Sequence, residues 1–449
     1  MQMEKQKLED IATVEISGVD KKTKDGEQEI RLCNFVDVYY NWAITTAQHD
    51  GFMFATARPN EISKFQLKKG QVALTKDSET RDDIGIPTYI ADDFDDVILG
   101  YHCALITPNK DILDGRYLNA LLHTDYAKKY FACNASGSGQ RYALSVEALN
   151  SFPVPMIPLR DQKRIGEIFS ALDKKIELNR RINQNLEAMM KLLYDYWFVQ
   201  FDFLNEGGKP YKASGGKMVW NEELKREIPQ GWGNMSIGDY APCKSGYAFK
   251  SKDFGCKGLP VIKIGNIQEN YTLDMADSQC IDLFNKTLFL AKRYDLVIAM
   301  TGATIGKFAI SQRNYWVNQR VGRFDLGDSP LLRLGFLFNS LKQEYFREQI
   351  FQIACGCAQP NISGEQIDSI LLLKPNNTVL NQFNKICKSL LELQSENYLQ
   401  IEELTKQRNE LLPLLMNGQV SVNSDLSTYT ILSFILLIQK YKSINLICW

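Results

Sequence analysis

The feature that most restricts the fold of this chain is an internal repeat that extends over nearly all of its 449 residues. Residues 144–151 (LSVEALNS) match residues 362–369 (ISGEQIDS) at an offset of 218 positions, with two serines and a glutamate in the same places. The apolar positions that follow keep this offset, and Gln140 matches Gln359 at an offset of 219. Twice 218 is 436, close to the full length, so the sequence predicts two copies of one structural unit.

Each copy ends in a long segment with apolar residues at heptad spacing, which predicts a helix. The first residues of successive heptads are Ile165, Leu172, Asn179, Leu186 and Leu193 in the first copy, and Phe383, Leu390, Asn397, Leu404 and Leu411 in the second. A buried asparagine fixes the register of a coil, because sliding the helices would leave its amide without a partner. We therefore expect an antiparallel coiled coil with Asn179 and Asn397 as register residues near its midpoint. The alternative is two separate surface helices on which both asparagines are solvated.

The globular portion of each copy has the pattern of an α+β domain. Strand-like runs occur at 71–75, 96–100 and 103–106 in the first copy, and at 259–264, 296–300 and 322–326 in the second. Residues 117–131 and 334–351 have apolar residues at helical spacing. We therefore predict an α+β fold with two globular domains in tandem repeat, separated by two long helices that form an antiparallel coiled coil.

The expected boundaries follow from the repeat and from the loops before each helix. They are 1–158 for the first globular domain, 159–204 for a central helical spacer region, 205–375 for the second globular domain, 376–422 for a distal helical spacer region and 423–449 for an atypical C-terminal tail.

Composition and charge exclude several classes of protein. Hydrophobic residues make up 45% and charged residues 23%, as in globular proteins, and the net charge of -1 excludes a basic nucleic-acid coat over the whole chain. The N-terminal segment MQMEKQKLED lacks the order of a signal peptide, and no run of about 20 apolar residues is present to span a bilayer. We expect a cytoplasmic protein without a membrane partner.

The sequence supplies no recognisable catalytic site. Residues 302–307 (GATIGK) depart from a phosphate-binding loop, because three residues rather than four separate the glycines and Phe308 follows the lysine. The chain has no Gly-x-Gly-x-x-Gly motif and no Asn-Pro-Pro-aromatic motif for amino-methylation of a base. With three histidines and no Cys-x-x-Cys pair, neither a nucleophile triad nor a metal site is predicted. We expect no catalysis by this chain alone.

The charge is unevenly distributed between the two copies. Residues 1–159 carry 17 basic and 23 acidic side chains, whereas residues 205–360 carry 20 basic and 15 acidic ones. Arginine, lysine, asparagine and glutamine bind base edges and phosphates. The candidates of these types are Lys307, Asn318, Gln319, Arg320 and Arg323 in the second copy, and Lys64, Lys69, Lys76, Arg81 and Arg141 as a local basic face in the first. The alternative is a set of solvated loops over buried aromatic residues.

Several stretches are specific enough to point to a family. They are 193–201 (LYDYWFVQF), 207–217 (GGKPYKASGGK), 228–232 (IPQGW), 300–307 (MTGATIGK), 318–322 (NQRVG), 359–363 (QPNIS) and 411–418 (LLPLLMNG). In these stretches the chain resembles the specificity subunit of Type I restriction–modification systems, along essentially all of residues 1–422. The first copy departs from the pattern because it lacks the Pro-x-Gly-Trp start of the second, and the pattern ends after Val422.

The resemblance implies two target-recognition domains, each binding one half of a bipartite sequence in double-stranded DNA, while the coil sets the unread spacer. It implies two methyltransferase and two restriction/translocase subunits as partners, which carry S-adenosylmethionine, ATP and Mg, so that this chain holds no cofactor. From the matching stretches we add Gln140, Thr301, Thr304, Gln359 and Asn361 as DNA-binding candidates.

Trp197 and Phe198 are candidates for partner docking, with a place in the buried core as the alternative. Two other function classes stay open: a standalone DNA-modifying enzyme, and a coiled-coil scaffold that binds only proteins.

Overall fold

The computed structural model describes residues 4–137, 139–255, 257–276, 278–282, 287–354 and 360–416. The chain forms two compact units. Among the described residues, unit 1 consists of those up to Leu178 together with those from Ile401 onward, and unit 2 of those from Asn179 to Gln400. Each unit therefore contains one globular domain and a part of both long helices, α7 (Leu159–Tyr194) and α12 (Asn377–Met416).

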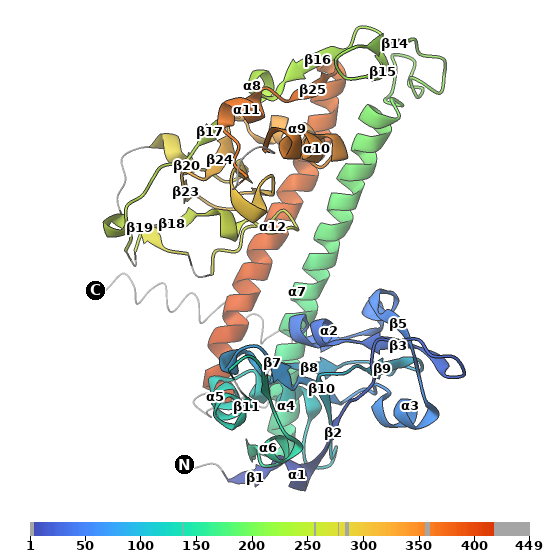
Figure 1. The fold of residues 1–449 in the computed structure, drawn as a ribbon, viewed down its shortest axis with the longest axis vertical. Coiled ribbons are helices and arrows are strands. Elements are labelled where there is room, and N and C mark those ends of the chain that lie inside the picture. The colour runs from blue at the N-terminus through green and yellow to red at the C-terminus, as the bar shows by residue number, and fades with distance from the viewer. Residues whose placement is uncertain are drawn as a thin grey trace. The chain divides into compact units, whose positions relative to one another are not determined.

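Unit 1 is a mixed α+β domain (Figure 1). Its strands are β1 (Lys5–Lys7), β2 (Ala12–Ile16), β3 (Gln28–Cys33), β4 (Ala43–Ile44), β5 (Met53–Ala57), β6 (Val72–Thr75), β7 (Asp77–Ser78), β8 (Pro87–Ile90), β9 (Val97–Leu99), β10 (Cys103–Pro108), β11 (Ser136–Gly137), β12 (Tyr142–Ala143) and β13 (Pro153–Pro155). Its shorter helices are α1 (Leu8–Ile11), α2 (Phe35–Tyr40), α3 (Pro59–Phe65), α4 (Gly115–Leu122), α5 (Asp125–Asn134) and α6 (Val146–Asn150). A five-stranded sheet of order β2-β10-β6-β8-β4 and a three-stranded sheet of order β5-β3-β9 form its centre.

The core of unit 1 explains why α7 begins where it does. The last strand, β13, pairs with β1, so the first copy has an opening strand although it lacks the Pro-x-Gly-Trp start of the second. Pro158 then precedes the helix, and its carbonyl accepts the first helical hydrogen bonds. Ile165, Phe169 and Leu172 on α7 are buried in the same apolar cluster as Leu412 of α12. This burial joins both long helices to the first globular domain.

A stack of three side chains fixes α12 on unit 1. The ring of Trp42 lies 3.9 Å from the ring of His123, and the guanidinium of Arg408 lies 4.5 Å from the Trp42 ring. Burial lowers the pKa of His123 to about 3, although its Nδ1 donates to the Asn119 carbonyl at 2.9 Å. The ring is therefore neutral at physiological pH and serves as an apolar surface for Trp42.

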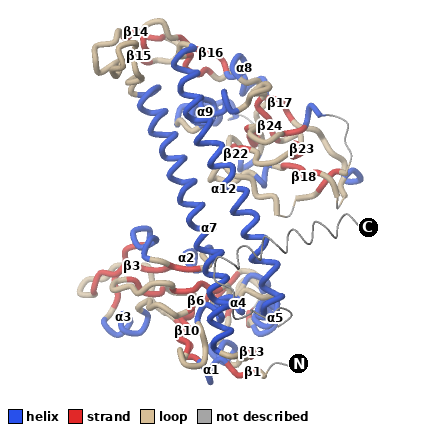
Figure 2. The backbone as a smooth tube through the Cα atoms, turned by 180° about the vertical axis from the view of Figure 1, so that it is seen from behind, coloured by secondary structure: helices blue, strands red, loops and turns tan. Residues whose placement is uncertain are grey.

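Unit 2 repeats this plan (Figure 2). Its strands are β14 (Met218–Asn221), β15 (Arg226–Pro229), β16 (Gly233–Ser236), β17 (Cys243–Ser245), β18 (Leu259–Ile262), β19 (Cys280–Ile281), β20 (Leu290–Ala291), β21 (Leu296–Ala299), β22 (Phe308–Ile310), β23 (Tyr315–Val317), β24 (Val321–Phe324) and β25 (Leu371–Lys374). Its shorter helices are α8 (Ile237–Tyr240), α9 (Leu331–Leu341), α10 (Glu344–Ala354) and α11 (Gly364–Asp368). Two four-stranded sheets have the orders β17-β24-β21-β22 and β19-β18-β23-β20.

The repeat predicted from the sequence is confirmed element by element. Helices α6 and α11, strands β13 and β25, and helices α7 and α12 begin 218 positions apart. All six strand-like runs named above contain strands. The two expected short helices are each divided in two, because Thr124 caps α5 by accepting from the Ala127 N–H, and a turn at Lys342–Gln343 separates α9 from α10. The tail at 423–449 lies outside the described residues.

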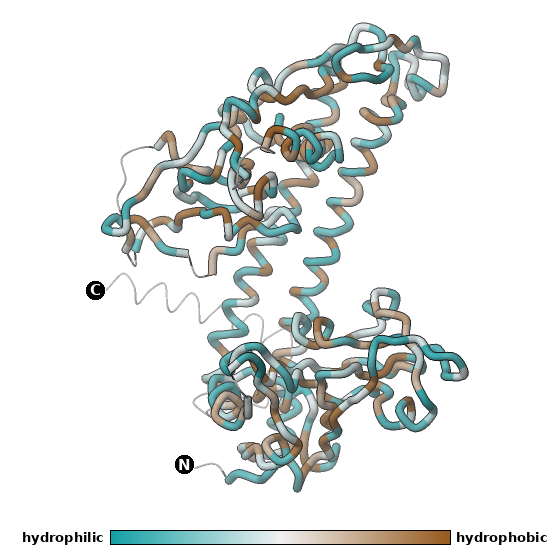
Figure 3. Tube along the Cα trace, in the orientation of Figure 1, coloured by the Kyte–Doolittle hydropathy of each residue, from teal (hydrophilic) through white to brown (hydrophobic). Residues whose placement is uncertain are grey.

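The long helices pair antiparallel within unit 2. Asn179 Nδ2 donates to Gln400 Oε1 at 3.1 Å, and Asn397 Nδ2 donates to Asn183 Oδ1 at 2.9 Å. The residue numbers therefore increase along α7 in the direction in which they decrease along α12, as in an antiparallel pair. Figure 3 shows polar and apolar residues alternating along both helices, as heptad spacing requires. Asn179 and Asn397 do not bond each other. Asn179 pairs with Gln400, about one helical turn from Asn397, and Asn397 pairs with Asn183, about one turn from Asn179.

We predict that Asn397→Leu lowers the free energy of unfolding by about 1–3 kcal/mol, because it leaves the buried Asn183 amide without its side-chain partner. The double variant Asn183→Leu/Asn397→Leu is expected to recover most of this loss, since both polar groups are removed. Hydrogen exchange of the helix amides measures both, with Asn185→Leu at an exposed helix position as the control. If the losses of stability from Asn183→Leu and Asn397→Leu simply added in the double variant, the two asparagines would not be coupled and the prediction would be contradicted.

Candidate nucleic-acid interface

In unit 1, three separate segments meet at one edge of the domain. The Lys76 N–H, at the end of β6, donates to the His102 carbonyl at 2.9 Å, and the Leu144 N–H donates to the Lys76 carbonyl at 2.8 Å. Strand β7 begins at Asp77 and pairs with β12. These bonds bring the turn between β9 and β10 beside the segment that carries Arg141, although the two are about 40 positions apart in the chain.

The side chains at this edge form a cluster around one carboxylate. Asp77, whose side chain is 10% exposed, accepts from Lys76 Nζ at 2.9 Å and from His102 Nδ1. Burial alone would raise the pKa of Asp77, but the hydrogen bonds from His102 and Lys76 lower it below its ordinary value. Nη2 of Arg141 lies 3.1 Å from the His102 ring nitrogens, and the half-exposed Tyr101 ring lies 3.8 Å from the His102 ring. The acidic first domain thus has a local group of cations beside aromatic rings.

Aromatic and basic side chains continue along this edge. The Arg81 guanidinium lies 5.1 Å from the ring of Tyr142 on β12. Tyr39 donates to the Asp83 carboxylate at 2.8 Å, and this bond raises the pKa of Tyr39 to about 12. Its neighbour Tyr40 is 73% exposed. These types bind phosphates and stack on bases, so the edge has the chemistry of a nucleic-acid surface.

The other predicted residues of unit 1 are more dispersed. Lys64, at the end of α3, pairs with Glu15 at 3.1 Å. Lys69 and Gln140 are exposed. The structure therefore brings Lys76, Arg81 and Arg141 together, and no contact joins Lys64 or Lys69 to them among the described residues.

Unit 2 contains the same backbone arrangement. The Met300 N–H donates to the Arg320 carbonyl at 2.9 Å, and the Ile362 N–H donates to the Met300 carbonyl at 2.9 Å. Thr301 and Asn361 form a β-bridge, in the place that β7 and β12 occupy in unit 1. The structure thus brings Thr301, Arg320 and Asn361 together. Gln359 lies outside the described residues.

The polar side chains around this arrangement differ in their access to solvent. Gln319 and Arg320 are exposed, and Asn318 Oδ1 accepts from the Arg320 N–H at 3.3 Å. Thr301 is buried, and its hydroxyl donates to the Pro360 carbonyl at 3.2 Å. The Thr304 hydroxyl is buried and has no hydrogen-bond partner among the described residues. Gln319 and Arg320 are the members best placed to reach a ligand.

Arg323 was predicted to contact DNA, but its side chain lies inside the domain. Its Nη1 lies 3.1 Å from Oδ2 of Asp295, and the two side chains are 14% and 8% exposed. Burial raises the pKa of Asp295, although the Lys292 N–H and Arg323 oppose the shift. Since this guanidinium is committed to a buried ion pair, we leave Arg323 out of the proposed interface.

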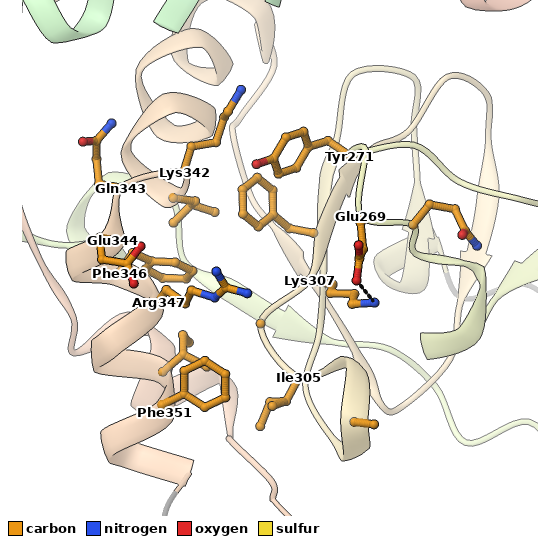
Figure 4. A pocket seen from close by; sticks show the side chains of 16 residues that line it. Glu269, Tyr271, Ile305, Lys307, Lys342, Gln343, Glu344, Phe346, Arg347 and Phe351 are labelled. Carbon is orange, nitrogen blue, oxygen red and sulfur yellow. Dashed lines mark ion pairs between the residues drawn. The ribbon is translucent and has the colours of Figure 1, made fainter. Parts of the chain in front are cut away.

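A pocket of about 380 Å³ lies beside the loop that carries Lys307 (Figure 4). Lys307 pairs with Glu269 at 3.1 Å on one wall of this pocket, and Lys342 pairs with Glu187 at 2.6 Å. The wall on the other side comes from α10, and Arg347 points from it towards Lys307. Both lysines are therefore neutralised by carboxylates, which weakens the electrostatic attraction between the pocket and an anion.

Trp197 and Phe198 lie inside the core of unit 2. They are 7% and 0% exposed, in the π-helical turn η3 (Asp195–Val199) that follows α7. The Phe198 ring lies 4.9 Å from the ring of Phe383 on α12 and 5.1 Å from the ring of Phe336 on α9. This is the buried-core alternative, so neither side chain belongs to an exposed docking surface.

The described residues offer no site for a metal ion or a membrane. No group of three His, Cys, Asp or Glu side chains in the described ranges is arranged to hold a metal. Nor does any helix in the part of the chain that the structure describes have the length and apolar character of a membrane span.

Sequence reasoning missed Tyr101 and His102. The signal was the repeat itself, because the offset of 218 carries these two residues onto Gln319 and Arg320, which were predicted. The match escapes notice because neither residue type is the same in the two copies.

Comparison with known families identifies the class to which this two-unit chain belongs. The family described as "Type I restriction modification DNA specificity domain" matches residues 2–188 and 229–402. One matched range falls on each copy of the repeat, and together they cover most of the chain. The chain therefore belongs to the family of Type I restriction–modification specificity subunits.

Similar proteins span most of the chain. It is 24% identical over 414 residues to the specificity subunit of Type I restriction enzyme HindI from Haemophilus influenzae, covering 80% of this chain and 88% of that protein. It is 23% identical over 316 residues to the specificity subunit of enzyme MjaIX from Methanocaldococcus jannaschii, covering 70% and 71%. The S subunit from M. genitalium has a similar fold, with a TM-score of 0.57 at 13% identity over 92% of this chain and 96% of that one.

The family membership confirms the function class predicted from the sequence. The chain is the DNA specificity subunit of a Type I restriction–modification system, and its globular parts are target-recognition domains. Subunits of this family determine the DNA sequence on which the complex acts and are not themselves catalytic.

Proposed function

We propose that the chain recognises a bipartite sequence in double-stranded DNA, with unit 1 reading one half-site and unit 2 the other. The observation that carries this proposal is the arrangement of backbone hydrogen bonds that occurs once in each unit, at Lys76 and His102 and again at Met300 and Arg320. The exposed side chains on the two copies differ, so the two half-sites differ in sequence. The DNA-contacting residues are Arg81, Tyr101, His102, Gln140 and Arg141 in unit 1, and Asn318, Gln319, Arg320 and Asn361 in unit 2. Lys76 and Lys307 are left out, like Arg323, because each is paired with a carboxylate.

The long helices set the number of unread base pairs between the half-sites. Each unit contains a part of both α7 and α12, so their length limits how the two reading edges are placed. Asn179 and Asn397 act as register residues, since a shift of the pair would break both of their hydrogen bonds.

The partners are two methyltransferase subunits and two restriction/translocase subunits, which hold S-adenosylmethionine, ATP and Mg. One exposed apolar face, on α7 and the turn after it, is the proposed docking surface for these subunits. Met189, Leu192, Tyr196 and Val199 follow one another at helical spacing and are 54%, 68%, 37% and 44% exposed. This apolar stripe replaces Trp197 and Phe198 as the proposed docking surface, because exposed apolar side chains in a row mark protein contacts.

We predict that Leu192→Asp weakens association with the methyltransferase subunit at least 10-fold and leaves the thermal unfolding of this chain unchanged. The side chain is 68% exposed, so the charge costs little in the free chain but is buried without a partner in the complex. Gln184→Asp, on an exposed position of the same helix outside the stripe, is the control. If the two variants lost association equally, or if neither lost it, the stripe would not be the docking surface.

Reconstitution tests the proposed function. The methyltransferase subunit alone, this chain alone and the two together are incubated with labelled S-adenosylmethionine and DNA that contains many candidate sites. We expect methyl transfer only from the combination. Transfer by this chain alone would favour a standalone modifying enzyme, and a failure of the purified chain to bind duplex DNA at moderate salt would favour a scaffold for proteins.

A further inference from the structure

The two reading edges correspond residue by residue. The Lys76 N–H bonds the His102 carbonyl, as the Met300 N–H bonds the Arg320 carbonyl, both at 2.9 Å. Parallel pairing of β3 with β9 matches that of β18 with β23: Leu32 faces Ile98 in the first and Val261 faces Trp316 in the second.

The same correspondence holds for the strands that flank the turn. In β2 and β10, Ile16 faces Ala104, and in β17 and β24, Ser245 faces Gly322. The offset is 229 for Ile16 and Leu32, 224 for Lys76, and 218 for Ile98, His102 and Ala104, so it decreases along the chain while the pairing is kept. His102 and Arg320 therefore occupy one and the same position of the fold in the two units.

Charged neighbours hold His102 in place. The pKa of Asp77 is lowered, so its carboxylate is ionised and accepts the proton on His102 Nδ1. Lys76 Nζ bonds the same carboxylate at 2.9 Å. Arg141 Nη2 lies 3.1 Å from both ring nitrogens, so the ring stands between Asp77 and the Arg141 guanidinium at the edge of the domain.

The surroundings of Arg320 leave its guanidinium exposed to solvent. Thr301 stands where unit 1 has Asp77, so no carboxylate neutralises the guanidinium from that position. No ion pair or side-chain hydrogen bond of Arg320 occurs within the described ranges, and the residue is exposed. A free guanidinium is a forked donor, and guanine O6 and N7 are the matching acceptors in the major groove.

We propose that His102 and Arg320 are the specificity-determining residues at corresponding positions of the two half-sites. Arg320 recognises a guanine. His102, with Arg141 held beside its ring, reads the base at the corresponding position of the other half-site. This inference rests on the proposed function, because it requires each unit to read its own half-site.

The test compares the methylated motifs of variants with that of the native chain, each expressed with the methyltransferase subunit of its own system. We expect His102→Ala to accept other bases at one position of one half-site, and Arg320→Ala to do so at one guanine of the other. Discrimination at each position should fall by roughly 5- to 150-fold. Lys129→Ala and Lys257→Ala, which remove one exposed cation from each unit, should leave the motif unchanged.

A base analogue separates direct readout from an indirect effect. The purified full-length chain is bound to a duplex with its motif, in which the guanine read by unit 2 is replaced by an analogue that lacks N7. The native chain should lose affinity, whereas Arg320→Ala should bind both duplexes equally. Equal loss in the two proteins would overturn the role of Arg320.

The outcomes separate this inference from the proposed function. If the native chain gave no bipartite motif, the proposed function would fail whatever the variants did. If the native motif were bipartite and both variants left every position unchanged, only this inference would fail. A variant that lost all DNA binding while its thermal unfolding stayed native would also overturn it, since a base-reading residue affects one position rather than the whole site.

Discussion

Removing one heptad from each long helix abolishes methylation of the original motif, and any motif that remains has a gap shorter by about three base pairs. Deleting residues 173–179 and 400–406 removes segments that face each other, because Asn179 is bonded to Gln400. Seven residues shorten a helix by about 10 Å and nearly preserve its face, and a turn of B-DNA takes roughly 34–36 Å for about ten base pairs. Mapping of methylated sites in cells that carry the variant measures the gap.

Deletions that do not match across the coil are the controls. Deleting 173–179 alone leaves the two helices unequal, so the pairing of Asn183 with Asn397 and the packing near the helix ends cannot both be kept. We expect this variant to lose methylation entirely. An unchanged gap in the matched double deletion would contradict the role of the helices in spacing.

Asp295→Ala destabilises unit 2 by about 3–5 kcal/mol. It leaves the Arg323 guanidinium, whose side chain is 14% exposed, without its countercharge inside the domain. It also removes the acceptor for the Lys292 N–H at 2.9 Å. Hydrogen exchange of the β21 and β24 amides reports on this unit separately, which matters because a two-unit chain does not unfold in one step.

Two further variants show whether the unpaired charge is the cause. Asp295→Ala/Arg323→Met removes both charges and should recover most of the loss. Glu222→Ala breaks the pair with Lys225, whose side chains are 79% and 74% exposed, and should cost under about 1 kcal/mol. A similar loss for the exposed and the buried pair would contradict the account.

The architecture was predictable from the sequence because it rests on periodic patterns. The heptads around Asn179 and Asn397 repeat over many turns, and the offset of 218 locates matching helices in both copies. The division of residues 117–131 into α4 and α5 was not predicted, because it depends on the single hydroxyl of Thr124 that caps the second helix.

The interface was less predictable, because residue type does not show which partner a side chain meets. Arg323 and Arg320 are three positions apart, yet one is held by Asp295 inside the domain and the other is exposed. Trp197 and Phe198 have the character of a docking surface but pack in the core, and the exposed stripe begins at Met189 on another face of the same helix. His102 gains its role from Asp77, a contact that spans 25 positions.

The measurement that tests the central claim most directly is a map of methylated bases in cells that lack other such systems and express this chain with its methyltransferase subunit. The account predicts one motif with two specific parts of different sequence and a gap of fixed length between them. A continuous motif, or a bipartite motif whose gap varies from site to site, would contradict recognition by two units held at a distance set by the paired helices.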